Sequence, residues 1–120
     1  MSQFFQNGDD VLWNPATRVA QVFMDMAAAH ARLLGTPSGL GPMEADECEV
    51  DVAAFAAFTD ALVRYYAGSN HPVLRSLMEG FVATALAVVR RGGGDVPAAD
   101  GAAVRHLVEL SHRHEAAMPR

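Results

Sequence analysis

The stretch that decides the fold is Leu77–Val89, "LMEGFVATALAVV", whose thirteen residues include a single charged side chain, Glu79. Apolar residues fall on almost every side of this stretch when it is drawn as a helix, and a helix that is apolar all round is a buried one. A helix that spans a bilayer needs roughly 18 to 20 apolar residues, and this stretch is shorter. It therefore predicts a buried central helix, surrounded by the other elements.

The residues on either side set the limits of this central helix. Ser69 or Asn70 can cap its start, with Pro72 in its first turn, because proline suits the first helical position. Arg90 and Arg91 suit its last turn, where the helix dipole is negative. The glycines that follow them predict its end.

Two further helices are predicted before and after the central one. The earlier helix extends from a cap at Asp51 to Gly68, and the later one starts near Asp100. Apolar positions recur in both at steps of three or four residues. In the earlier helix they are Val52, Phe55, Phe58, Leu62 and Tyr66; in the later one they are Val104, Leu107, Val108, Ser111 and Met118.

The N-terminal third predicts a fourth helix and a small hairpin. The helix has Asn14 as its cap, Pro15 at its first position and Gly35 as its stop. Its expected inner face comprises Val19, Val22, Phe23, Met26, His30, Leu33 and Leu34. Before it, two short hydrophobic pieces flank the turn signal Asn7–Asp9. The sequence thus predicts a single all-α domain over residues 1–120, with about four helices and a short N-terminal β-hairpin or extended arm.

The amino-acid composition limits which cellular compartment and which classes of partner are expected. The 120 residues carry a formal charge of -5, and all nine cations are arginine. Nucleic-acid binding is disfavoured because it needs clustered cations. The single cysteine excludes an internal disulfide, and the first residues have no basic segment followed by an apolar one. The sequence therefore predicts a cytoplasmic protein that binds neither nucleic acid nor membrane.

The segment Gly41–Asp51, "GPMEADECEVD", concentrates negative charge around the only cysteine. Its spacing fits no calcium loop, so no metal or other cofactor is predicted. The neighbouring carboxylates should raise the pKa of the Cys48 thiol and suppress its reactivity. If the segment is extended, Glu47, Glu49 and Asp51 lie on one face and Cys48 on the other. The predicted partner-binding residues are Glu44, Asp46, Glu47, Glu49 and Asp51.

A small-molecule pocket is the alternative site. His30 lies on the apolar stripe of its helix, and Glu79 interrupts the central helix beside Gly80. A buried carboxylate needs a partner or a raised pKa, so Glu79 should pair with His30, Arg18 or Arg64. The alternative ligand-binding set is Trp13, His30, Cys48 and Glu79, beneath a loop over residues 35–42.

The pieces "LWNP" at residues 12–15, "GPM" at 41–43, "DEC" at 46–48 and "EGF" at 79–81 also carry a resemblance. Over about residues 2–90 the chain resembles a family of small, functionally uncharacterised proteins from actinobacteria. The resemblance implies a bacterial cytoplasmic protein and transfers no catalytic residue.

Three functional hypotheses follow, and the sequence leaves open whether the protein is an enzyme. The leading one is a non-catalytic interaction protein, of immunity or regulatory type, whose acidic surface docks onto a basic protein. The second is a small-ligand-binding protein or enzyme with a pocket lined by His30 and Glu79. The third is a homodimer formed through exposed apolar parts of the helix after Asp51 or the helix after Asp100.

Overall fold

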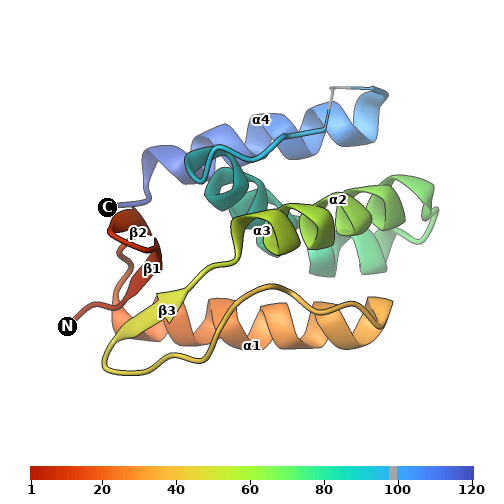
Figure 1. Ribbon diagram of the computed structural model, residues 1–120. Coiled ribbons are helices and arrows are strands. Elements are labelled where there is room, and N and C mark those ends of the chain that lie inside the picture. Colours follow the sequence, from red (N-terminus) through yellow and green to blue (C-terminus); the bar gives the residue numbers. More distant parts are fainter. Residues whose placement is uncertain (98–99) are drawn as a thin grey trace.

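The computed structural model describes residues 1–97 and 100–120, and it combines four helices with a small sheet (Figure 1). α2 and α3 lie between α4 on one side and α1 on the other, and both chain ends lie near the sheet (Figure 1). In chain order the elements are β1 (Phe4–Asn7), β2 (Asp10–Trp13), α1 (Thr17–Leu34), β3 (Glu47–Glu49), α2 (Val52–Gly68), α3 (Pro72–Arg91) and α4 (Ala102–Ala116).

The predicted N-terminal hairpin is confirmed. β1 and β2 pair antiparallel, with Asn7 opposite Asp10 across a two-residue loop. Gly8 begins that loop at φ 61°, and glycine at the first central position suits the tight turns that match strand twist. The hairpin brings Phe5 and Trp13 together on the inner face of the sheet, where their rings stack at 5.5 Å.

The prediction of an all-α fold is wrong, because a third strand joins this hairpin. β3 pairs parallel with β1, which places Phe5 opposite Cys48, and the strand order is β2-β1-β3. Parallel neighbours need a crossover connection, and α1 supplies it. The protein is therefore an α+β fold in which a three-stranded mixed sheet closes one end of the helical layer.

The outer edge of β3 is covered by the segment that precedes it. The amide of Gly41 donates to the carbonyl of Glu49 at 2.9 Å, and Glu44 and Glu47 exchange backbone hydrogen bonds, each 2.9 Å long. An uncovered edge strand would present free backbone groups for pairing with another chain. Because residues 39–44 cover this edge, β3 can contact another protein only through its side chains.

Some predicted helix limits are confirmed and others are wrong. α1 begins at Thr17 with Ala16 at its N-cap position, rather than at Pro15 with Asn14 as its cap. The Asp51 carboxylate accepts a hydrogen bond from the amide of Ala54 at the start of α2. Gly35 ends α1 with a left-handed conformation at φ 63°. The cap of α3 is His71 rather than Ser69 or Asn70, because the His71 ring accepts from the amide of Leu74 and Pro72 follows directly. Ala98 and Ala99, in the connector before α4, lie outside the described residues.

α3 is the central helix, as the sequence predicts. Nine of its twenty residues are buried, and they include every position from Ala85 to Val89. By length and composition it is also the one helix among the described residues that could cross a membrane. Half of it is buried inside the protein, and core helices pass the same test, so this is weak evidence for a membrane span.

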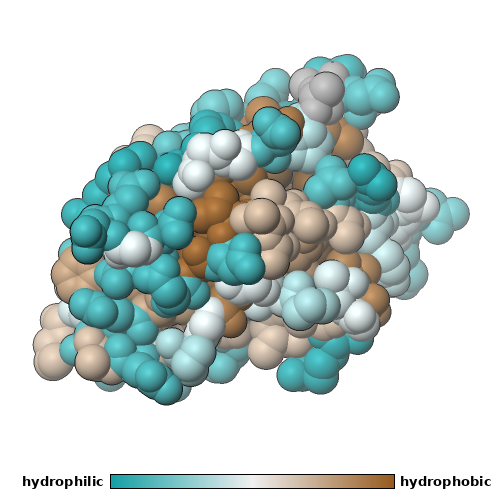
Figure 2. All heavy atoms as spheres, in the orientation of Figure 1, coloured by the Kyte–Doolittle hydropathy of each residue, from teal (hydrophilic) through white to brown (hydrophobic). Residues whose placement is uncertain are grey.

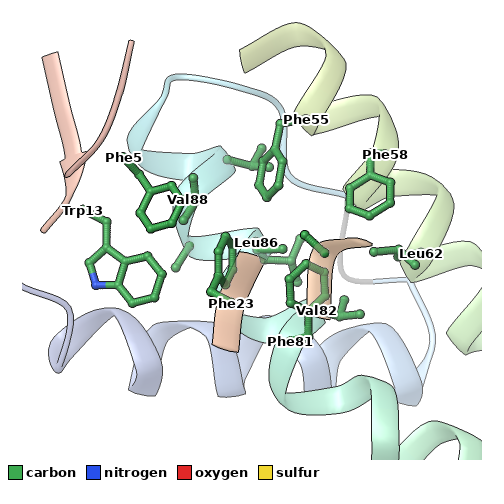
Figure 3. Close-up of a cluster of buried hydrophobic side chains, with 14 of the residues drawn as sticks. Phe5, Trp13, Phe23, Phe55, Phe58, Leu62, Phe81, Val82, Leu86 and Val88 are labelled. Atoms are coloured by element: carbon green, nitrogen blue, oxygen red, sulfur yellow. The ribbon is translucent and has the colours of Figure 1, made fainter. Parts of the chain in front are cut away.

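Aromatic side chains from five elements, β1, β2, α1, α2 and α3, meet at the centre of the molecule (Figure 3). Phe23 of α1 lies among the rings of Phe5, Trp13 and Phe81, at centroid distances of 5.0 to 5.3 Å. Each aromatic side chain buries a large apolar area. Phe23 therefore joins α1 to the sheet and to α3 through one cluster.

The buried face of α1 is rotated from the predicted one. The helix buries Ala20, Phe23, Ala27 and His30. Val19, Val22 and Leu33, which the sequence predicts to face inward, are 48%, 61% and 45% exposed. The apolar arc of α1 is wider than the surface that α2, α3 and the sheet cover, so its outer part stays open to solvent.

Candidate functional site

Acidic side chains gather at the sheet end of the molecule. Residues 1–17 and 36–51, which form the sheet and its covering segment, contain seven carboxylates and no arginine or histidine. All nine arginines belong to the remainder of the chain, together with seven other carboxylates. The seven at the sheet end are all exposed: Asp9, Asp10, Glu44, Asp46, Glu47, Glu49 and Asp51. We call them the sheet-end carboxylates.

Uncharged donors hold several of these groups in place. The Glu49 carboxylate accepts from the amide of Gly8 at 2.9 and 3.1 Å and so ties β3 to the hairpin turn. Side-chain amides of Gln3 and Gln6 lie 3.4 Å from Asp46 and Glu47. None of the ion pairs in the described part of the chain includes a sheet-end carboxylate. Their negative charge is therefore not neutralised within these residues.

β3 presents its residues in the alternation that the sequence analysis considers. Glu47 and Glu49 are exposed on either side of Cys48, which is completely buried. Val50 is also buried, at 2% exposure. Asp46 does not belong to the strand, because it adopts φ 63° in the turn before it. The anionic groups thus surround the edge of the sheet, and the thiol lies on its inner face.

The surroundings of Cys48 are those of a structural residue rather than of a nucleophile. Burial raises the pKa of its thiol from 9.0 to about 11, and the Glu49 charge adds to this shift. The thiol donates to the Gly41 carbonyl at 3.2 Å. The sequence analysis attributes a raised pKa to the neighbouring carboxylates, whereas burial is the larger cause. A nucleophilic cysteine needs the thiolate, which this environment disfavours.

We expect Cys48 to react slowly with Ellman's reagent at pH 8. A pKa of about 11 leaves on the order of 0.1% thiolate at that pH, and burial blocks access as well. The native protein should react at least roughly a hundredfold more slowly than the protein unfolded in urea. Equal rates in the two states would show that the thiol is accessible.

His30 lies in the core as the sequence predicts, at 7% exposure. Its Nδ1 donates to the carbonyl of Met26 at 2.7 Å, since a carbonyl can only accept. The ring stacks on Phe81 with centroids 4.6 Å apart. Its Nε2 is buried and has no partner among the described residues.

Glu79 has partners that the sequence analysis does not predict. Its carboxylate lies 3.2 Å from Nε2 of His106 on α4 and accepts a hydrogen bond from the Tyr66 hydroxyl at 3.3 Å. Burial, with the charge and hydrogen bond of Glu79, raises the pKa of Tyr66. Phe81, the partner of His30, is two residues from Glu79 and thus about 200° around α3. Glu79 and His30 therefore contact opposite sides of the central helix.

An apolar groove lies between α1 and α3. Its volume is about 440 Å³, within the usual range of small-molecule sites. The only charged side chain that lines it is Arg18, which is exposed and pairs with no acid among the described residues. The lining comprises Trp13, Arg18, Val19, Val22, Phe23, Met26, Gly80, Phe81 and Thr84. We call it the α1–α3 groove.

Trp13 is thus the member of the predicted ligand-binding set that lines this groove. Cys48 lies on the buried face of β3, and Glu79 faces Tyr66 and His106. His30 is linked to the groove only through its stacking on Phe81. The sequence analysis misses Arg18 as a lining residue, because nothing in the sequence indicates which side of α1 remains uncovered.

Gly80 forms part of the groove and is exposed in the middle of α3. Glycine inside a helix costs about 1 kcal/mol relative to alanine. A Cβ atom added at Gly80 would meet nothing within 4 Å. No described segment of the chain fills this space. Packing within the described chain thus gives no reason for glycine here.

A second hollow, of about 600 Å³, lies between the start of α2 and the segment after α3. Figure 2 shows apolar surface gathered over this part of the molecule, beside hydrophilic surface at the sheet end. Alanines of α2 line it, with Asp60 and Asp95 as its charged residues. It adjoins residues outside the described part of the chain.

Arg90 and Arg91 do more than complement the dipole of α3. Arg91 Nε lies 3.2 Å from the Glu115 carboxylate, and its other nitrogens donate to the carbonyls of Leu12, Glu115 and Met118 at 2.8 to 3.1 Å. Arg90 pairs with the same carboxylate and donates to Ser111. This cluster fastens β2 and the end of α4 to α3.

Two of the three histidines of α4, His106 and His114, contact side chains of α3. His114 lies 2.9 Å from the Thr84 hydroxyl, and His106 pairs with Glu79. Among the described residues, no group of three histidine, cysteine or acidic side chains is arranged to hold a metal ion.

The fold and these surfaces define a small α+β protein with an anionic sheet end and an apolar groove on its helical side. The chain belongs to a family of unknown function (DUF6086), whose family model matches residues 1–120. The match extends beyond the resemblance seen in the sequence, which ends near residue 90. No curated protein and no solved structure matches the chain.

Proposed function

We propose that the protein is a non-catalytic interaction protein, of immunity or regulatory type, that docks a basic partner protein in the cytoplasm through its sheet-end carboxylates. The observation that carries this proposal is the concentration of exposed carboxylates at the sheet end, where Arg91, which contacts the Leu12 carbonyl, is itself paired with Glu115. Seven exposed carboxylates share one end of the molecule with no arginine or histidine in the same segments. A surface with one sign of charge steers a partner of opposite charge and favours one orientation of approach.

The way these carboxylates are held supports the same proposal. Carboxylates that serve mainly to stabilise a fold are commonly paired with cations or used as caps. Among the sheet-end carboxylates, only Glu49 and Asp51 accept hydrogen bonds from backbone amides of the described residues. Asp10, Glu44 and Glu47 are exposed and hold no backbone amide with their side chains among the described contacts. These three are available for a partner.

The covered edge of β3 determines the kind of contact. Because residues 39–44 already pair with that edge, a partner would not add a strand there. It would meet side chains, and arginine is the most suitable partner for exposed carboxylates because it can bind them in a bidentate manner. A binding mode of this kind weakens as salt rises.

We expect neutralisation of Asp10, Glu44 and Glu47 to weaken docking without unfolding the protein. The variant Asp10→Asn/Glu44→Gln/Glu47→Gln removes three charges and leaves both backbone-binding carboxylates intact. Its affinity for a partner isolated from the native host should fall at least about tenfold, as measured by calorimetry. Its free energy of unfolding should change by less than about 0.5 kcal/mol per site.

The matched control is Asp95→Asn/Asp100→Asn/Glu109→Gln, which removes the same charge from exposed sites elsewhere. It should retain wild-type affinity. If the sheet-end variant binds as tightly as this control, the sheet-end carboxylates are not the docking surface.

The alternative, a small-ligand pocket lined by both His30 and Glu79, has less support in the geometry. The two side chains contact opposite sides of α3. Trp13 is the residue of that predicted set that lines an open cavity, and that cavity is the α1–α3 groove. The homodimer hypothesis, which places the contact on exposed apolar parts of α2 or α4, also has little support. Exposed large apolar residues of the described chain lie mainly on α1 and α3, with Tyr65 on α2 and none on α4.

A further inference from the structure

We propose that the α1–α3 groove binds a small amphipathic anion, a molecule with an aliphatic body and a single carboxylate or phosphate head group. The groove is lined by none of the sheet-end carboxylates. Binding there is therefore independent of the docking function proposed above.

The first observation is the chemistry of the lining. Valine, methionine and phenylalanine side chains supply most of it, and exposed apolar surface of this kind favours an apolar ligand. Val19 and Val22 are 48% and 61% exposed, so a ligand seated against them would remove apolar area from water.

The second observation is the charge at the groove. Arg18 is its only charged lining residue and makes no ion pair or hydrogen bond among the described contacts. A guanidinium binds carboxylates and phosphates in a bidentate manner. Arg18 therefore favours a ligand with acceptor oxygens over an uncharged hydrocarbon.

The third observation is Gly80. Glycine in a helix interior lowers stability, yet the space beside its Cα is open rather than filled by the described chain. Residues that break a local structural rule without a packing reason are expected at functional sites. A ligand lying against the α3 backbone supplies that reason, because a side chain at residue 80 would occupy its place.

Trp13 provides a direct readout of binding. It is the only tryptophan in the chain and lines the groove, so its fluorescence reports on an occupant. We would titrate the protein with decanoate, decyl phosphate, decanol and decyltrimethylammonium below their micelle-forming concentrations, and measure stoichiometry by calorimetry. We expect one molecule of decanoate or decyl phosphate to bind, with decanol weaker and the cation weakest.

Two variants separate the parts of the proposal. Arg18→Gln should lower affinity for the anions about tenfold and leave decanol binding unchanged. Arg32→Gln, the same change at an exposed site in the last turn of α1, should have no effect. Gly80→Leu should block every ligand by filling the groove.

Gly80→Ala distinguishes a loss of ligand binding from a loss of folding. It should raise Tm by roughly 4 °C, because alanine is the better helix former, and should weaken anion binding at the same time. The proposal is overturned if no amphiphile changes Trp13 emission at one-to-one stoichiometry. Wild-type affinity in Gly80→Leu, or decanol binding as tightly as decanoate, would overturn it as well.

Discussion

Replacement of Arg91 by methionine should lower the free energy of unfolding by about 3 kcal/mol. The side chain of Arg91 is only 8% exposed, and it bonds to the Glu115 carboxylate and to three backbone carbonyls. Methionine retains much of the apolar stem but leaves those carbonyls without their donor. Urea unfolding followed by circular dichroism would measure the loss.

Arg64→Met is the matched control for this prediction. Arg64 is 80% exposed and pairs with Asp60 one turn away in α2, so its loss should cost less than about 0.5 kcal/mol. Similar losses for the two variants would show that the Arg91 cluster does not hold the ends of the chain to α3.

The same cluster predicts an acid dependence. Burial raises the pKa of Glu115, but the hydrogen bonds and charges of Arg90 and Arg91 outweigh it, so the pKa lies below the ordinary 4.5. Since the folded-state pKa is depressed, the contribution is complete above pH 4.5 and is lost as pH falls through the folded-state value. The difference between wild type and Arg91→Met should therefore shrink in acid.

Phe23→Ala should lower the free energy of unfolding by about 3 to 4 kcal/mol. Phe23 is 5% exposed and contacts aromatic rings from the sheet, α2 and α3, so its removal weakens the attachment of α1 to the rest of the protein (Figure 3). Tm should fall by about 12 to 16 °C, measured by differential scanning calorimetry.

Val22→Ala tests whether this effect belongs to the aromatic cluster. Val22 precedes Phe23 on α1 but is 61% exposed, so its truncation should change stability by less than about 0.5 kcal/mol. A loss at Val22 as large as the loss at Phe23 would contradict the orientation of α1 described here.

The helices were predictable because their signals are local. Asp51 and Gly35 act through hydrogen bonds and backbone conformations within a few residues, and the uniform apolarity of Leu77–Val89 makes that stretch a core helix in any arrangement. The hairpin turn at Gly8 is local in the same sense.

The sheet was not predictable as a whole, because β3 forms only by pairing with β1, and β2 and α1 separate these two strands along the chain. Glu47–Glu49 is three residues long and contains two glutamates, which have low strand propensity. Its hydrogen bonds with β1 and with residues 39–44 determine its conformation. The sequence does not indicate this pairing, because β1 and β3 become neighbours only after α1 has brought them together in the folded chain.

The two candidate sites also differ in how far the sequence predicts them. Exposure of Glu44, Asp46, Glu47, Glu49 and Asp51 could be anticipated because charged side chains rarely become buried alone. The α1–α3 groove could not, since it depends on which part of the apolar arc of α1 remains uncovered. His106 and Glu115, the ion-pair partners of Glu79 and Arg91, likewise belong to α4, whose position the sequence does not indicate.

The central claim is that the sheet end is the docking surface, and site-specific photo-crosslinking in the native host tests it most directly. p-Benzoylphenylalanine would replace Glu47 on β3 or, as the control, the exposed Glu109 on α4. The account predicts one discrete adduct with a basic protein from position 47, lost when Asp10 and Glu44 are neutralised, and none from position 109. No adduct from position 47, or the same adduct from both positions, would contradict it.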